Sequence, residues 1–557
     1  MKRHIVFYAV SFFIGCFSSM CYISNIYIGA VIAASFLYII FIYEDKIIII
    51  IMLAFFLCGA FRFNSYFNYL PKNEEKIRIL DHRENYIVGD IKGRRVLIKG
   101  EVEGLLEGLS IAAKGEFKKD INYGKGIIGS YQIYEYKNKK EDLIYKFGDR
   151  KRRVIKKLEK NLDKDKLALV MSLCFGDVSL MDNIEKYKLQ KLGVIHAISV
   201  SGFHISIVYK VIHMILGFKL ALIFTLLYVI FTGFKYSTLR AFIMILILSF
   251  SDKVYKNYDG ISSLATAFLV ILFIKPYSFM EMGFSLSFLA TLGIILHYNN
   301  IKSTLKSVPE KLKDTLSITL SSQIFTLPYI AFTMENFSLG FLLGNIFLMP
   351  IFSLIVILGN LSILTIKADL LFSIISYILY CLTYAVQYVS YLLIKICPPI
   401  SYLGSLEGIY FMIVYFSYIM IKKGVVKFKA LPLISFLLIF INTYSLFPSV
   451  YFINNEYVNG AVIRYNNECV MVCNYDLEKG KEVIQIKESF NATKVITDIK
   501  DSDSIYIKNY ETNILFEEDR VSGIKLRKNN KNFLVISEEE RDYWYKIIFG
   551  RVVKWRY

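Results

Sequence analysis

Long apolar runs separated by short polar loops dominate the chain. Three runs occupy 5–23, 26–42 and 46–63, and further runs follow one another from 195 to 447. About 20 apolar residues in a helix are needed to cross the roughly 30 Å hydrocarbon layer of a bilayer. The pattern therefore predicts a polytopic α-helical membrane protein of about 13 spans. The later runs are expected at about 195–216, 220–233, 237–250, 261–275, 281–298, 314–333, 338–366, 370–396, 406–421 and 430–447.

Two polar regions break this pattern. In residues 64–140, short segments of partial apolar–polar alternation, such as 95–102 and 130–136, are separated by glycines. This is typical of short strands joined by turns, and the size suits a small five-stranded β-barrel (OB-like) module, although periodicity alone does not name the fold. Residues 448–557 predict a short β-rich region. The expected order is three N-terminal spans (1–63), the OB-like module (64–140), a basic amphipathic helical region (141–192), a transmembrane channel domain (193–447) and a C-terminal soluble region (448–557).

Loop charge predicts the orientation. The chain carries 66 Lys and Arg against 47 Asp and Glu. With thirteen spans and the N-terminus inside, the outer loops of the ten-span block hold Lys235, with Lys275 and Lys395 at span ends. Since cytoplasmic loops are rich in Lys and Arg, this arrangement places both soluble regions outside. The inner loops then hold Lys219, Lys253, Lys256, Lys302, Lys306, Lys311, Lys313, Lys367, Lys422, Lys423, Lys427 and Lys429.

A basic cluster on the predicted outer side runs against this charge rule. It lies on a charged helix between 146 and 166. Such a helix can rest on the head groups of a lipid bilayer, or it can attract a polyanion that arrives from outside. The candidate polyanion-binding residues are Arg150, Lys151, Arg152, Arg153, Lys156 and Lys157.

A dense group of polar residues opens the first run of the second block. In Gly193-Val-Ile-His-Ala-Ile-Ser-Val-Ser-Gly-Phe-His-Ile-Ser206, the candidates are His196, Ser199, Ser201, Gly202 and His204. Polar groups at membrane depth usually face a bundle interior or a water-filled path, although a helix cap with two satisfied histidines is the alternative. We expect an unwound turn at Ser201 and Gly202 that exposes backbone groups to a pathway.

The same motif lacks the features of a metal or nucleophile site. On a straight helix, His196 and His204 are separated by about 12 Å of rise and 80° of rotation, so they cannot share a metal. No Asp, Glu or Cys lies within the motif, and no Gly-x-Ser-x-Gly occurs. We therefore expect no metal, no cofactor and no catalytic residue here.

Four polar residues lie in or at the ends of later runs. Arg240 needs a partner or water, and Glu281 and Glu335 are both candidate partners. Gln323 and Asn345 can line a path, but an isolated Gln or Asn in a span more often joins neighbouring helices. We include Arg240, Glu281, Gln323 and Asn345 among the predicted passage residues.

Several ordered motifs resemble those of the ComEC family of competence DNA-uptake proteins. The segment 193–206 resembles the family's Gly-x-x-His-Leu-Leu-Ala-Ile-Ser-Gly-Leu-His signature, with Ala197 and Ser199 as departures. The similarity continues through Leu173–Ser179, Ser237–Ala241, Gly283–Gly293, Thr326–Tyr329 and Phe337–Pro350. The similar region covers roughly 165–420. The N-terminal spans and the β module also lie where the family has its N-terminal region and OB-type domain.

The resemblance implies passage of single-stranded DNA through the bacterial cytoplasmic membrane during natural competence. It further implies an external DNA receptor and a cytoplasmic ATP-driven motor, since no Walker-type Gly-x-x-x-x-Gly-Lys-Ser/Thr occurs in this chain. A DNA strand needs basic groups and aromatic stacking surfaces. Tyr131, Tyr134 and Tyr136 could supply the surfaces, or they could pack inside the barrel.

One family feature is missing from this sequence. Many members carry a metallo-β-lactamase-like nuclease with a His-x-His-x-Asp-His signature, whereas the last histidine here is His297. The region from 448 onward is therefore expected to be a degenerate or unrelated β-rich region, and the protein is expected to be a transport channel, not an enzyme.

Two other functions fit parts of the sequence. An exporter or lipid-linked polymer translocase could share the membrane scaffold. A membrane enzyme could use His196 and His204 as acid and base, although their spacing and the lack of a nucleophile argue against it.

Overall fold

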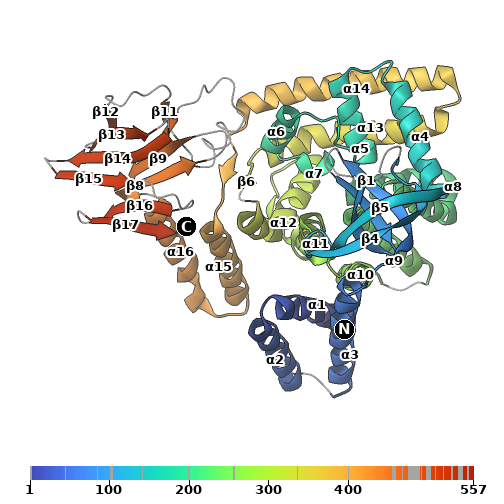
Figure 1. Cartoon of the computed structure of the whole chain (residues 1–557), viewed down its shortest axis with the longest axis horizontal. Coiled ribbons are helices and arrows are strands. Elements are labelled where there is room, and N and C mark those ends of the chain that lie inside the picture. Colours follow the sequence, from blue (N-terminus) through green and yellow to red (C-terminus); the bar gives the residue numbers. More distant parts are fainter. Residues whose placement is uncertain are drawn as a thin grey trace. The chain divides into compact units, whose positions relative to one another are not determined.

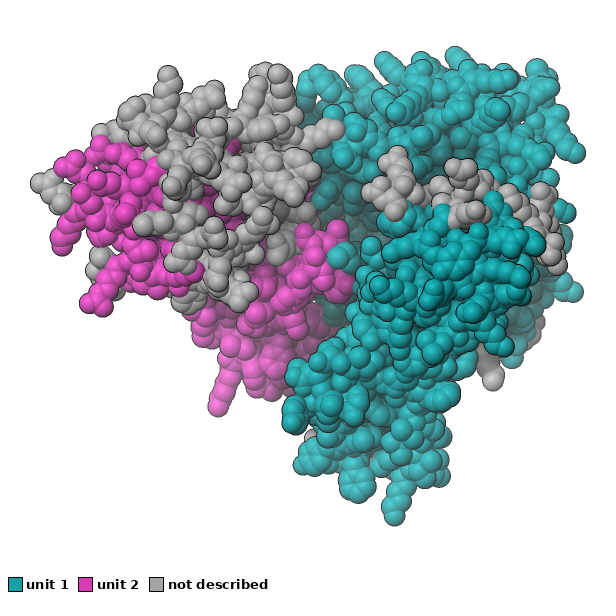
Figure 2. Space-filling view, in the orientation of Figure 1, with its two compact units in different colours: residues 1–325, 340–396 teal, residues 326–339, 397–557 magenta. Residues whose placement is uncertain are grey.

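The chain folds into two compact units. The computed structural model describes residues 3–556 except 44–45, 84–85, 101–104, 141, 199–200, 255–256, 335, 399, 444, 455–458, 467, 474–489, 491, 493, 497–503, 508–509, 518–519, 529–530, 537–542 and 549–550. One unit contains 1–325 and 340–396, and the other contains 326–339 and 397–557 (Figure 2). The predicted 193–447 segment is thus divided between them.

Three apolar helices begin the first unit: α1 (His4–Ser24), α2 (Ile26–Tyr43) and α3 (Lys46–Phe67). Helices α1 and α3 approach closely because a glycine of each faces the other's backbone. A Cβ atom on Gly15 would lie 2.1 Å from the carbonyl oxygen of Phe56, and one on Gly59 would lie 2.2 Å from that of Phe12. Glycine is therefore required at both positions.

Five strands form a closed barrel of order β1-β2-β3-β5-β4. Strands β3 and β5 pair in parallel, and the other neighbours pair antiparallel. Alternate residues such as Ile77, Ile98 and Ile133 fill the interior, as expected for strands with one buried face. The strands are β1 (Glu74–Arg83), β2 (Tyr86–Ile91), β3 (Arg94–Gly100), β4 (Ser110–Asn122) and β5 (Ile127–Lys140).

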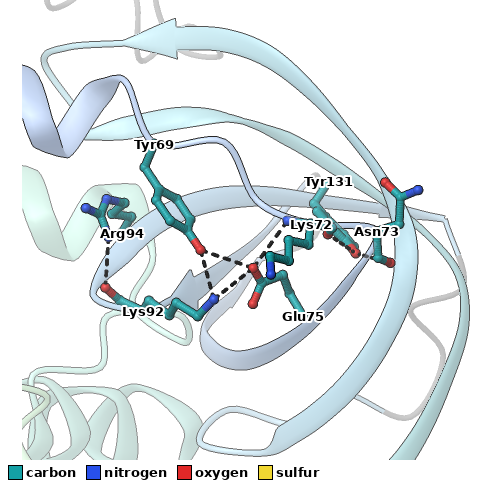
Figure 3. A network of polar contacts seen from close by, with 7 residues as sticks. All are labelled: Tyr69, Lys72, Asn73, Glu75, Lys92, Arg94 and Tyr131. Atoms are coloured by element: carbon teal, nitrogen blue, oxygen red, sulfur yellow. Dashed lines mark hydrogen bonds and ion pairs between the residues drawn. The ribbon is translucent and has the colours of Figure 1, made fainter.

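A buried carboxylate fixes the path of the chain into the barrel. Glu75 accepts hydrogen bonds from Lys92 Nζ at 3.0 Å, from the Tyr69 hydroxyl at 3.1 Å and from the Lys72 amide at 3.2 Å (Figure 3). Burial alone would raise the pKa of Glu75, but these donors hold it below its usual value. The Tyr131 hydroxyl donates to the carbonyls of Lys72 and Asn73 beside this network.

Four helices follow the barrel: α4 (Leu143–Leu158), α5 (Lys164–Phe175), α6 (Asn183–Lys191) and α7 (Ile195–Ile198). Helix α4 is amphipathic, with Val154 and Leu158 fully buried and basic residues on the other faces. Asp142 caps it by accepting from the amides of Ile144 and Tyr145. The charged helix predicted from the sequence corresponds to α4, and three further short helices follow it.

Helix α8 (Gly202–Phe231) reverses direction at Gly217. The backbone there has φ 74° and ψ 178°, a conformation nearly restricted to glycine. Ile205 in the first arm packs in one cluster with Tyr228 and Val229 of the second. A straight helix would separate residues 205 and 228 by about 34 Å. The element is therefore a hairpin of two short arms, in line with the two runs predicted at 195–216 and 220–233.

Helices α9 (Tyr236–Lys253), α10 (Gly260–Ile274), α11 (Met282–Thr304) and α12 (Glu310–Thr333) come next, with the short η1 turn (Ser278–Met280) before α11. Helix α9 runs beside the first arm of α8, since the Tyr209 hydroxyl lies 2.8 Å from Ser249 Oγ. Arg3 pairs with Asp259 at 3.0 Å, so the N-terminus and the α9–α10 loop lie together. The predicted orientation also places these two segments on one side.

Helices α13 (Phe341–Thr365) and α14 (Asp369–Ile396) form a second hairpin in the first unit, with α4, α5 and α6 beside it (Figure 1). Lys157 of α4 donates to the carbonyl of Ile366 at 2.8 Å and pairs with Asp369 at 2.6 Å. The sequence placed Lys157 outside and Lys367 inside. These two placements cannot both hold, so this part of the predicted topology is wrong.

The second unit combines helices with two β-sheets. One sheet has the order β11-β10-β9-β8-β16-β17, and the other has the order β12-β13-β14-β15. Val450, Ile463 and Tyr545 of the first sheet share one core with Ile524 and Leu526 of the second, so the two sheets pack face to face. The helical elements are α15 (Ser405–Lys422), η2 (Val426–Ala430) and α16 (Leu431–Thr443), and a small ladder joins β6 (Asn336–Phe337) to β7 (Ser401–Tyr402). The sheet strands are β8 (Ser445–Asn454), β9 (Asn459–Asn466), β10 (Glu468–Cys473), β11 (Lys494–Ile496), β12 (Ser504–Ile507), β13 (Tyr510–Glu517), β14 (Arg520–Lys528), β15 (Lys531–Ile536), β16 (Tyr543–Ile548) and β17 (Arg551–Arg556).

Seven of the described helices have the length and composition to cross a membrane: α1, α3, α8, α11, α13, α14 and α15. Three shorter apolar helices lie at 26–42, 236–251 and 260–274. The apolar helices support a polytopic membrane protein with a β-rich C-terminal region. The number of spans stays a prediction, because the reversal in α8 shows that helix length alone does not count crossings.

The reversal at Gly217 predicts a short distance between the two ends of α8. Spin labels on cysteines at Phe203 and Leu227, both partly exposed, should lie within about 20 Å of each other, whereas a straight helix would separate them by about 36 Å. Pulsed electron spin resonance in a cysteine-free background measures this distance. A control pair at Ile47 and Phe61 of the continuous helix α3 should give about 21 Å along the axis.

Candidate functional site

The N-terminus of α8 is built by Ser201 and His204. The Ser201 amide donates to His204 Nδ1 at 2.9 Å, and Ser201 Oγ lies 2.9 Å from the same nitrogen. His204 thus takes the place that Glu or Gln has in a capping box. The helix-cap alternative considered from the sequence accounts for this half of the ring.

The other half of the His204 ring has no such explanation. Because Nδ1 accepts a hydrogen bond from an amide, the ring is neutral and carries its proton on Nε2. His204 is buried, and its Nε2 atom has no hydrogen-bond partner among the described residues. An unpaired buried donor costs about 1–3 kcal/mol, so this N–H calls for an acceptor.

Arg240 lies against the same helix end. Its Nη1 donates to the Ser287 carbonyl of α11 at 2.8 Å, and its guanidinium lies over the Phe288 ring at 5.9 Å. A Cβ atom on Gly202 would lie 2.7 Å from Arg240 Nη2. Glycine at 202 therefore lets the guanidinium reach the first turn of α8.

The Arg240 side chain is buried and short of acceptors. The side chain is 9% exposed, and its Nε has no hydrogen-bond partner in the described part of the chain. A helix N-terminus carries about half a positive charge, so it repels a guanidinium and attracts an anion. The arrangement is suited to a phosphate or carboxylate that would accept from both groups.

Arg240 and His204 do not face one another. Gly202, which contacts Arg240, and His204 are two positions apart, or about 200° around the helix. The structure therefore places the two unpaired donors on different faces of the α8 N-terminus. An extended polymer with repeated acceptors could offer one to each donor.

Glu281 has a different role from the one considered for it. It accepts from Arg95 Nη1 at 2.7 Å and from the Tyr236 hydroxyl at 3.0 Å. It therefore joins the barrel to α9 and is not the partner of Arg240, and Glu335 lies outside the described residues. The backbone amide of Arg95 also donates to the Tyr66 hydroxyl oxygen at 3.1 Å, which strengthens this joint.

The remaining motif residues are dispersed. His196 Nδ1 lies 3.2 Å from the Gly193 carbonyl, and Ser199 lies outside the described residues. Asn345 Nδ2 donates to Thr319 Oγ1 at 3.3 Å, which joins α13 to α12 as the interhelical alternative predicted. Gln323 lies half-buried on α12. Roles in passage stay predictions for these residues.

The barrel tyrosines have unequal exposure. Tyr131 is fully buried in the barrel core, so it cannot stack on a base, and its assignment to DNA binding is wrong. Tyr136 is partly buried against the same core. Tyr134 is exposed, and its hydroxyl donates to Glu116 at 3.1 Å. Of these three tyrosines, Tyr134 alone offers an open ring for stacking.

Four of the six basic candidates on α4 are used in ion pairs. Lys151 pairs with Asp177 at 3.0 Å, Arg153 with Asp149 at 2.6 Å and Lys157 with Asp369. Arg152 lies over the Tyr145 ring and near Asp149. Arg150 and Lys156 are exposed and form no ion pair with the described residues. These two side chains are the ones available to a polyanion.

The structure also joins residues that the sequence reasoning did not combine. Lys235 donates to the Gly176 carbonyl at 2.9 Å, next to the Asp177–Lys151 pair. Burial would raise the pKa of Asp177, but Lys151 and the Ser179 hydrogen bonds hold it below its usual value. Burial lowers the pKa of Lys235. The Gly176-Asp177-x-Ser179 motif was the available signal, whereas nothing in the sequence singled out Arg95.

No group of three or more His, Cys, Asp or Glu side chains gathers in a metal-binding arrangement among the described residues. The unpaired groups at the α8 N-terminus are hydrogen-bond donors, namely Nε2 of a neutral imidazole and Nε of a guanidinium.

Comparison with known proteins adds an independent finding. A family model described as "Competence protein" matches residues 173–424. The chain is 27% identical over 239 residues to "ComE operon protein 3" of Bacillus subtilis, an alignment that covers 41% of this chain and 30% of that protein. It is 30% identical over 122 residues to an uncharacterized protein of Mycoplasma genitalium, which covers 20% of this chain and 31% of that protein.

These matches cover parts of the proteins concerned. The chain spans about three tenths of the length of each curated relative. No solved structure matches it. The matched region contains α8, α9 and both unpaired donors.

The close approach at Gly202 predicts a difference between two glycine variants. Gly202→Ala should lower the free energy of unfolding by about 1–3 kcal/mol, because the new methyl group would displace the Arg240 guanidinium. Thermal unfolding of the purified protein in detergent measures the effect. Gly283→Ala is the matched control, since nothing lies within 4 Å of a Cβ atom there, and equal destabilisation by both variants would contradict the packing described.

Proposed function

Because the chain belongs to the ComEC family of competence proteins, we propose that it passes single-stranded DNA across the bacterial cytoplasmic membrane during DNA uptake. The observation that carries the proposal is the pair of buried, unpaired donors at the N-terminus of α8. A phosphodiester backbone supplies an acceptor at every nucleotide. It could therefore satisfy Arg240 Nε and His204 Nε2 on successive faces of the helix end as it moves.

The chemistry of these donors suits passage better than tight binding. His204 is neutral, so it offers one hydrogen bond without the full attraction of a second cation. Arg240 supplies the charge. A translocating strand must bind well enough to enter and weakly enough to leave, and a single cation with a neutral donor meets that condition.

The barrel and α4 would form the entrance on the outer side. Arg150 and Lys156 are exposed cations, and Tyr134 is an exposed ring in the same unit. Exposed cations attract a polyanion over the Debye length of about 8–10 Å. In this proposal a separate receptor delivers the DNA, and a separate ATP-driven motor pulls it from the cytoplasm.

An exporter or polymer translocase remains distinguishable by direction and cargo. Deleting the gene should leave DNA bound at the cell surface and abolish DNase-protected uptake. Unchanged protected uptake in a cell that takes up DNA would rule out the proposed function.

The donors predict a specific defect in variants. His204→Leu, Ser201→Val and Arg240→Leu should each reduce DNase-protected uptake by at least about tenfold, since one charge-assisted hydrogen bond contributes about 1.5–3 kcal/mol. Protein levels in the membrane, measured by immunoblot, should stay near normal. Ser206→Ala is the control in the same helix, because Ser206 Oγ donates to the Gly202 carbonyl at an exposed position. Lower abundance with unchanged uptake per molecule would show that these residues are structural ties.

The ion pairs on α4 predict which cations neutralise phosphates. Substituting both Arg150→Gln and Lys156→Gln should reduce the slope of log affinity for single-stranded DNA against log salt by about 0.7 for each phosphate that is no longer neutralised. Fluorescence anisotropy with the full-length protein in detergent measures this slope. Lys157→Gln should leave it nearly unchanged, since Lys157 is held by Asp369 and Ile366. If Lys157→Gln reduced the slope as much as the Arg150→Gln and Lys156→Gln double substitution, the result would contradict the proposed entrance.

A further inference from the structure

Helix α14 has two sharply different faces. Its buried face carries small and aliphatic residues, including Ser376, Leu379, Thr383, Val386 and Ser390. A second face, centred about 120° away around the helix, carries a stripe of tyrosines that lie within about 80° of one another. The stripe consists of Tyr377, Tyr380, Tyr384, Tyr388 and Tyr391, which are between 38% and 70% exposed.

Polar segments of the chain lie along the whole length of the α13–α14 hairpin. At one end Lys157 meets Ile366 and Asp369, and Asn161 Nδ2 donates to Ser376 Oγ at 3.1 Å. At the other end a Cβ atom on Gly344 would lie 2.2 Å from the Leu192 carbonyl oxygen. Residues 344 and 366 are separated by about 33 Å of helix, the thickness of a hydrocarbon layer.

This arrangement decides how the hairpin can sit in a membrane. Between the two ends, Cys174 Sγ donates to the Ile355 carbonyl at 3.4 Å, and the adjoining Gly176–Asp177 turn carries the ion pair with Lys151. If α13 and α14 crossed the bilayer, this ion pair would lie at hydrocarbon depth, and α4 and α6 would lie at opposite sides. Charges in hydrocarbon cost several kcal/mol each. A hairpin parallel to the membrane keeps all these groups at one polar surface.

We propose that the α13–α14 hairpin lies in the plane of one membrane interface and that the tyrosine stripe of α14 contacts lipid head groups. Tyrosine is enriched at this depth because its ring is apolar and its hydroxyl is polar. The exposed neighbours Leu370, Ile374, Ile378 and Ile396 extend the apolar surface beside the stripe. Their presence matches the apolar face of an interfacial helix.

A DNA strand fits this face less well. Single-stranded DNA needs a basic track beside the aromatic rings. The only charged residues in α14 are Asp369 and Lys395, and Lys395 Nζ lies over the Tyr391 ring at 4.1 Å. The stripe therefore has stacking surfaces but only two cations over its rings among the described residues, Lys395 and Lys166 of α5, whose Nζ lies 4.4 Å from the centre of the Tyr380 ring and pairs with Asp163. This inference concerns the membrane placement of the chain and does not depend on DNA passage.

Depth measurements along the stripe test the proposal. Nitroxide labels on single cysteines at Tyr377, Tyr384 and Tyr391, in the reconstituted full-length protein without other cysteines, report depth through oxygen and nickel-chelate accessibility. We expect all three depths to agree within about 5 Å at head-group level. A spread near 21 Å, the length from 377 to 391 along the helix, would overturn the proposal.

Two comparisons make the outcome decisive. Labels at Ile50, Leu57 and Phe61, exposed positions of α3, should show a spread of about 16 Å because that helix crosses the bilayer. Each labelled protein is first required to unfold thermally like its unlabelled parent. If a thymidine oligonucleotide shields the α14 labels from the nickel chelate, or if they are as accessible as a fully aqueous site, the lipid contact is wrong.

Discussion

The contact of the Arg240 guanidinium with the first turn of α8 is the constraint around which this protein is built. It brings two sources of positive potential together inside an apolar domain and leaves Arg240 Nε without a partner among the described residues. Such an arrangement is unfavourable unless an anion visits it. Gly202 permits the approach, the Ser287 carbonyl holds Nη1, and His204 completes the helix end. The chemistry of the site therefore follows from one close approach between α8 and α9.

The barrel depends on a second polar joint. Arg95 reaches from β3 to Glu281, and Tyr236 at the start of α9 donates to the same carboxylate. Tyr66 and Tyr277 pack at 5.1 Å between ring centroids, and a Cβ atom on Gly126 would overlap the Tyr277 ring. The residue that begins α9 is thus fixed to the barrel four positions before Arg240.

The sequence predicted elements better than partners. Apolar runs located most helices, and alternation located the barrel strands, because burial on one face leaves a periodic trace. The polar motif at 193–206 led to the α8 N-terminus for a different reason, because polar residues are costly at membrane depth. The sequence suggested Glu281 as a partner of Arg240. In the structure Glu281 pairs with Arg95, which lies 186 residues away on a strand, where no local pattern points to it. Tyr131 could not be separated from Tyr134 by composition, since only barrel closure decides which ring faces inward. The assignment of Lys367 to the inner side depended on counting apolar runs as alternating crossings. Hydropathy shows only how long a run is, whereas the contacts of Lys157 show which loops share a side.

The central claim is that a DNA strand passes the N-terminus of α8 on its way through the membrane. The most direct measurement is site-specific photo-cross-linking in cells that are taking up labelled DNA. A benzoyl-phenylalanine at Phe203, a partly exposed residue in the first turn of α8, should cross-link to DNA, whereas the same group at the exposed Ile50 of α3 should not. Cross-links to DNA at neither position, or equally at both, would contradict the account.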